Sequence, residues 1–111
     1  MRDTFEKLFW DNKSVRMGEL LKFTGTIGGK RKDLNVLITD VYLIDERYFN
    51  FVFEDHVWLG TFNFYGESLK ELLKCKMNKG KKVIFTAKVL PYSGKTNYGL
   101  KLDKNSIVEI L

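Results

Sequence analysis

The segment from Lys81 to Leu102 constrains the fold of this chain more than any other. In its first half, every second position holds an apolar residue of one set: Val83, Phe85, Ala87 and Val89. A period of two predicts a β-strand with one buried face. Pro91 has no backbone N–H to donate, so the regular strand should end there. The segment therefore predicts two strands joined by a loop.

The loop of this hairpin, Tyr92–Asn97, together with Tyr98 carries turn-forming residues, two aromatic rings and the cation Lys95. Turn formers in such a loop are expected. The aromatic rings and the cation allow two interpretations. The loop either covers part of a core, or it binds a polyanion that also offers flat bases.

Three further strands are expected before this hairpin. The first spans Gly18–Ile27, where Gly25 should permit a bulge or a sharp bend. It is followed by a turn at Gly28–Asp33 with three consecutive cations, and then by a second strand at Leu34–Ile44. The third lies within Tyr48–Tyr65, which holds eight of the 16 aromatic residues. Most of these rings should be structural, although such density also suits a platform for stacking bases.

Two helices and a closing segment complete the prediction. Glu67–Met77 has an apolar stripe at helical spacing, formed by Leu69, Leu72, Leu73 and Met77. A short N-terminal helix is expected within residues 1–16, where Phe5, Leu8 and Phe9 recur at helical spacing. Residues 106–111 alternate again and should form a last apolar segment that closes the structure.

The predicted order is that of the five-stranded OB-fold barrel, with one helix between strands 3 and 4. We therefore expect a mainly β, single-domain protein over residues 1–111, with a helical extension at 1–16 and the barrel at 17–111. In this fold, oligonucleotides bind to the faces of strands 2 and 3 and to the loops that join strands 1–2 and 4–5. Here those loops are Gly28–Asp33 and Tyr92–Asn97, and both carry cations.

The net charge of +5 is concentrated in the second part of the chain. Residues 1–66 hold nine Lys or Arg against ten acids, whereas residues 67–111 hold ten Lys against four acids. Such asymmetry favours an electropositive face. The single cysteine, Cys75, fits a reducing cytoplasm. No run of residues is long and apolar enough for a membrane span, and the N-terminus does not have the pattern of a signal peptide.

The sequence gives little support to catalysis. Asp55 and His56 are adjacent, but neighbouring strand residues point to opposite faces, so they make a poor acid–base pair. His56 has no evident co-ligands for a metal. Cys75 is expected to be a small buried residue rather than a nucleophile. We expect no catalytic residues, no metal and no cofactor.

Three stretches carry a resemblance to known proteins: Asp55–Trp58, Gly80–Val89 and Tyr92–Lys95. They are similar to a D-H-[LV]-W strand, a G-x-x-[IV]-x-F-x-A-[RK]-V strand and a tyrosine-glycine loop in small, mostly uncharacterised proteins of phages and mobile elements of Gram-positive bacteria. More broadly, residues 18–102 resemble OB-fold single-stranded DNA-binding proteins. The chain departs from the first pattern at Lys81 and Lys82, where an acid often follows the glycine, and by its aromatic insert Tyr48–Phe53.

We therefore hypothesise that the protein binds single-stranded nucleic acid, with DNA favoured over RNA, without sequence specificity. Phosphates would be contacted by Lys30, Arg31, Lys32, Lys88, Lys95 and Lys101, and bases would stack on Tyr92, Tyr98 and Trp58. The alternative is a protein-interaction module that uses the N-terminal helix or the Tyr48–Phe53 insert, either with a protein partner or as a homo-oligomer.

Overall fold

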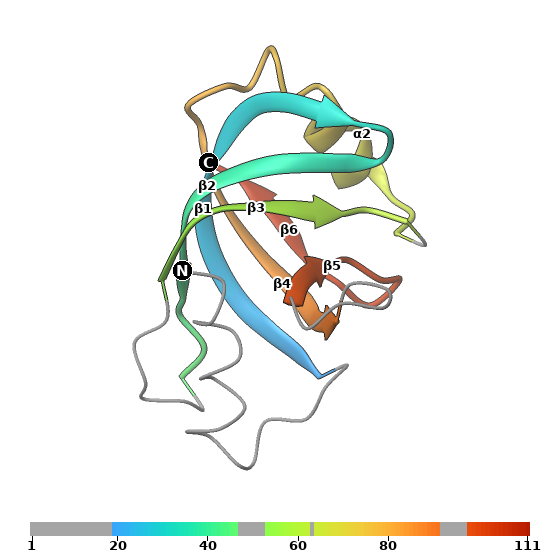
Figure 1. Cartoon of the computed structure of the whole chain (residues 1–111). Coiled ribbons are helices and arrows are strands. Elements are labelled where there is room, and N and C mark those ends of the chain that lie inside the picture. The colour runs from blue at the N-terminus through green and yellow to red at the C-terminus, as the bar shows by residue number, and fades with distance from the viewer. Residues whose placement is uncertain (1–18, 47–52, 63, 92–97) are drawn as a thin grey trace.

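A computed structural model describes residues 19–46, 53–62, 64–91 and 98–111. In chain order its elements are β1 (Leu20–Lys32), β2 (Asn35–Leu43), β3 (Phe53–Gly60), α2 (Glu67–Leu73), β4 (Lys82–Pro91), β5 (Tyr98–Lys101) and β6 (Val108–Ile110) (Figure 1). The helix expected at 1–16, the loop at 92–97 and most of the aromatic insert lie outside the described residues.

Five of the strands close into a barrel. Their order is β1-β2-β3-β5-β4, and β4 pairs back onto β1. All pairings are antiparallel except that between β3 and β5, which runs through Gly60 and Lys101. With α2 between β3 and β4, this is the OB-like barrel that the element order predicted. β6 extends the sheet by pairing with Val83–Phe85 of β4.

The barrel core is built by the alternating residues of β4 together with those of β1 and β2. All four predicted inward residues of β4 are buried, with no more than 1% of their surface exposed. Phe85 stacks on Phe23 of β1, with ring centroids 5.7 Å apart. Burial of each such side chain contributes roughly 1.5–3 kcal/mol. The period-two pattern of this strand therefore identified the inner face correctly.

The predicted turn at Gly28–Asp33 is wrong. β1 continues to Lys32, and the turn comprises Asp33 and Leu34. Between the paired residues Ile27 and Arg31 the strand carries a bulge, within which Gly29 has a φ of 81°. A glycine pair in a sequence usually indicates a turn, but a bulge can hold such a pair within a strand. The three consecutive cations consequently lie along the end of a strand, beside the hairpin turn.

Helix α2 is shorter than predicted because it ends at Leu73. The chain then makes a series of turns in which the side chain of Asn78 donates a hydrogen bond to the carbonyl of Glu71. Met77, expected on the apolar stripe, is 80% exposed as a result. The part of the chain that the structure describes has no helix long and apolar enough to cross a membrane.

Candidate nucleic-acid interface

Trp58 occupies the outer face of the barrel on β3. Its two neighbours in the strand, Val57 and Leu59, are buried in the core. Alternation therefore directs the Trp58 side chain outward, where it is half-buried beside its cross-strand partner Leu37 on β2. This position belongs to the strand 2–3 surface that oligonucleotides use in barrels of this type.

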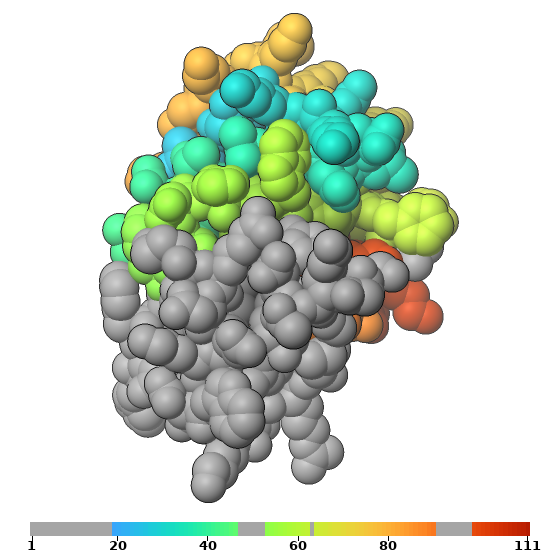
Figure 2. Space-filling model, in the orientation of Figure 1, coloured from blue at the N-terminus to red at the C-terminus, as the bar shows by residue number. Residues whose placement is uncertain are grey.

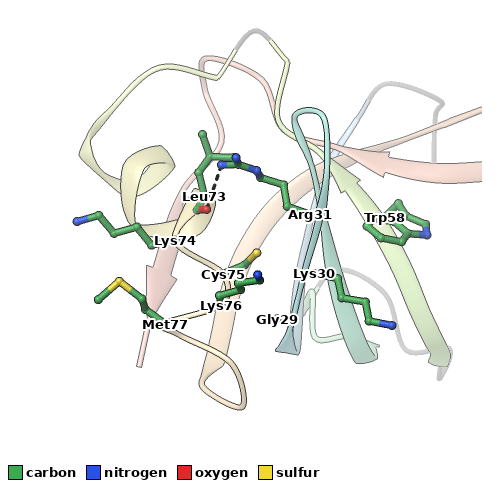
Figure 3. A pocket seen from close by; sticks show the side chains of 9 residues that line it. All are labelled: Gly29, Lys30, Arg31, Trp58, Leu73, Lys74, Cys75, Lys76 and Met77. Atoms are coloured by element: carbon green, nitrogen blue, oxygen red, sulfur yellow. Dashed lines mark hydrogen bonds between the residues drawn. The ribbon is translucent and has the colours of Figure 1, made fainter.

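A first cavity, of about 550 Å³, lies between the hairpin end of β1 and the segment that follows α2. Figure 2 shows these two parts of the chain next to each other on the surface. Among the described residues that line the cavity, four are cations and none is an acid. Its lining, drawn in Figure 3, comprises Gly29, Lys30, Arg31, Trp58, Leu73, Lys74, Cys75, Lys76 and Met77.

Arg31 connects the hairpin to the helix. Its Nη1 donates a hydrogen bond to the carbonyl oxygen of Leu73 at 3.3 Å, as Figure 3 shows. A cation at this end of a helix also interacts favourably with the partial negative charge of the terminal carbonyls. Lys74 has an acidic neighbour as well, with its Nζ 3.6 Å from Glu71 Oε1. Arg31 therefore has a structural contact that the sequence did not indicate, and its role in phosphate binding stays a prediction.

Trp58 also lines a second cavity, of about 370 Å³. Lys101 of β5 lies over the ring of Phe62, with Nζ 5.2 Å from the centroid. This cation–π contact restrains the ammonium group at the cavity wall. The described lining again includes no acid: Asn35, Trp58, Gly60, Phe62, Leu90, Gly99, Leu100 and Lys101.

Phe62 was not among the predicted site residues. Phe62 and Phe64 are two residues apart, a spacing that would put both on one face of a strand. However, Phe64 is 5% exposed and Phe62 is 59% exposed. β3 has already ended at Gly60, and the Phe64 N–H donates to the carbonyl of Thr61 in a turn. Alternation does not apply in a turn, so no local signal could have distinguished the exposed ring from the buried one.

The closed barrel brings predicted cations from distant parts of the chain into one row. Lys32 of β1 pairs with Asn35 of β2, which pairs in turn with Gly60 of β3. Gly60 pairs with Lys101 of β5, and Lys101 pairs with Lys88 of β4. Cross-strand partners share a face of a sheet. Lys32, Lys101 and Lys88 therefore border the same outer surface, on either side of the second cavity.

Lys88 is engaged in an ion pair on this surface. Its Nζ lies 2.7 Å from Asp103 Oδ2, and the two side chains are 33% and 18% exposed. The hydrogen bond from Lys88 lowers the pKa of Asp103, partial burial opposes this effect, and the backbone N–H of Asn105 adds to the lowering. A phosphate that binds Lys88 would have to compete with this carboxylate.

The Asp103 ion pair predicts a pH-dependent contribution to stability. Because the pKa of Asp103 is lower in the folded protein, its contribution is present above the unfolded value, about 4, and is lost as the pH falls through the folded value. We expect Asp103→Asn to lower the melting temperature at pH 7, with the difference from the unmodified protein shrinking as the pH falls below about 4. Thermal melts across this range test it, and a difference that is independent of pH would contradict it.

The remaining sequence predictions have mixed outcomes. Tyr92 and Lys95 lie outside the described residues. Tyr98 begins β5 opposite Pro91, and its predicted stacking role stays a prediction. Cys75 is buried, as predicted. Within residues 19–46, 53–62, 64–91 and 98–111, no group of three or more His, Cys, Asp or Glu side chains is placed to hold a metal ion.

No family model, curated protein or solved structure matches this chain. The resemblance to proteins of phages and mobile elements therefore stays a prediction.

Proposed function

We propose that this protein binds single-stranded nucleic acid, with DNA as the first candidate, on the outer face of β2, β3 and β5. One observation carries the proposal: Trp58 lines two adjacent cavities whose described walls hold five cations and no acid. The cations are Lys30, Arg31, Lys74, Lys76 and Lys101.

The chemistry of the two cavities suits a strand whose bases are unstacked. An indole ring stacks on any base, and such stacking contributes roughly 1–3 kcal/mol per base. Lysine and arginine side chains around the ring bind the phosphates on either side of that base. A duplex keeps its bases stacked inside and offers none to Trp58, so the arrangement favours single strands.

The alternative hypothesis, a protein-interaction module, relies on residues 1–16 and on the insert Tyr48–Phe53. These lie outside the described residues apart from Phe53, which packs with its ring centroid 4.8 Å from that of Tyr42. No contact of the described residues favours this function over nucleic-acid binding. A protein partner, a homo-oligomer and a cytoplasmic location stay predictions.

Salt dependence tests the proposed role of the lysines. We expect the protein to bind dT oligomers with an affinity that falls steeply with added salt, by about 0.7 in the log–log slope for each phosphate neutralised. Changing Lys30, Lys32 and Lys101 together to glutamine should reduce the slope by about 2, since three phosphate contacts are lost. Fluorescence titrations at several salt concentrations measure both quantities.

Lys22→Gln serves as the matched control for these titrations. Lys22 is exposed on β1, lines neither cavity, and pairs with Thr86, outside the row that joins Lys32, Lys101 and Lys88. Its loss should leave the slope unchanged. Absence of binding at low salt would contradict the proposed function. Binding with an equal slope in the triple variant would show that the strand lies elsewhere on the protein.

A further inference from the structure

The floor of the second cavity presents a side-chain amide. A Cβ built on Gly60 would lie 3.5 Å from Asn35 Oδ1 and 3.5 Å from Lys101 Cγ. The Asn35 side chain therefore lies against the bare backbone of Gly60, next to the stem of Lys101. Asn35 begins β2 and is exposed, so its amide is accessible from the cavity.

The polar groups of this cavity have distinct chemistry. Lys101 is a donor only and is restrained over Phe62, which suits a phosphate. The Asn35 amide offers both a donor and an acceptor, which suits the edge of a base rather than a phosphate. Trp58 supplies a ring on which a base can stack, and the volume of about 370 Å³ lies within the range of small-ligand pockets.

We propose that the second cavity holds one nucleobase, stacked on Trp58 and hydrogen-bonded along its edge by Asn35. The Watson–Crick edge of a base is free in a single strand, and on this edge each of the four bases presents a donor beside an acceptor. The Asn35 amide, which also offers one of each, can therefore make two hydrogen bonds to any base. This proposal rests on the proposed function and adds to it a residue that contacts the edge of the base.

The test uses four nonamers of thymidine that differ at the central position, which is dA, dC, dG or dT. Competition titrations against a labelled dT oligomer give four relative affinities. We expect the unmodified protein to bind the four oligomers with similar affinities, because the amide suits every base. In Asn35→Asp the carboxylate only accepts hydrogen bonds. The oligomer with dG, whose N1–H and N2 amino group both donate, should then bind about tenfold more tightly than that with dT.

Ratios of affinities isolate base recognition from other effects of the substitution. The added charge of Asn35→Asp weakens binding of all four oligomers, but a general loss leaves the ratios unchanged. Circular dichroism and a thermal melt establish that the variant is folded. Unchanged ratios in Asn35→Asp would overturn the base pocket and leave the proposed function standing. Failure to bind any oligomer would overturn both.

Discussion

Trp58→Ala is expected to weaken the binding of single-stranded oligonucleotides by about tenfold to a hundredfold, the range that the loss of one stacked base implies. Of the described residues, only Trp58 lines both cavities. Its removal therefore takes away the proposed stacking surface and also a wall that the two cavities share. No single lysine should have an effect of this size, because each contributes one screened contact.

Anisotropy of a labelled oligonucleotide is the appropriate measurement, because the substitution removes an intrinsic fluorophore. Trp58→Phe keeps an aromatic ring and should recover part of the affinity. His56→Ala is the matched control. His56 shares the outer face of β3, is exposed, and lines neither cavity. Binding by Trp58→Ala that equals that of the unmodified protein would contradict the central position of this ring in the site.

The barrel could be predicted because its strands carry strong local patterns. The inward residues of β4 alternate without interruption, and Pro91 is the last residue of the strand, as its missing donor implies. The helix between the third and fourth strands was also evident from its apolar stripe. The spacing of apolar residues and the position of a proline are local properties of the sequence, so they can be recognised before any tertiary contact is known.

The site was only partly predictable because it depends on pairing between distant strands. Trp58 and Lys101 were identified individually, but their proximity follows from the parallel pairing of Gly60 with Lys101. Asn35 carries no signal of its own in the sequence, since its proposed role rests only on its place beside Gly60. The cations of β1 were assigned to a loop because a glycine pair in a bulge has the same composition as a turn.

The ion pair of Lys88 shows a similar limit. The alternation of β4 correctly placed Lys88 on the outer face of the barrel. Alternation does not reveal which residue of another segment a side chain will contact. Asp103 reaches Lys88 because β5 returns antiparallel beside β4, with Lys101 opposite Lys88. An exposed cation in the sequence is therefore a weaker indication of phosphate binding than the same cation in a cavity without acids.

Gly25→Val is expected to lower the free energy of unfolding by about 3 kcal/mol or more, the upper part of the range for overpacking a core. A Cβ at this position would lie 2.4 Å from Ile38 Cγ2 and 3.2 Å from the carbonyl oxygen of Thr39. The register between β1 and β2 also shifts here, and Asp40 adopts a φ of 49° in the irregular stretch of β2. The register shift at Gly25 is an irregularity of the kind that the glycine predicted, where a bulge or a sharp bend was expected.

Thermal and denaturant unfolding measure the loss, which for a domain of this size corresponds to a fall in melting temperature of about 10 °C or more. A double-mutant cycle identifies its cause. Ile38→Ala alone leaves a cavity and destabilises the protein, but it also removes the methyl group that a new Cβ at Gly25 would meet. The double variant with Gly25→Ala and Ile38→Ala should therefore lose less free energy of unfolding than the two single variants together. Neighbouring substitutions that relieve each other are not additive. Additive losses would place the clash at the carbonyl oxygen of Thr39 rather than at Ile38.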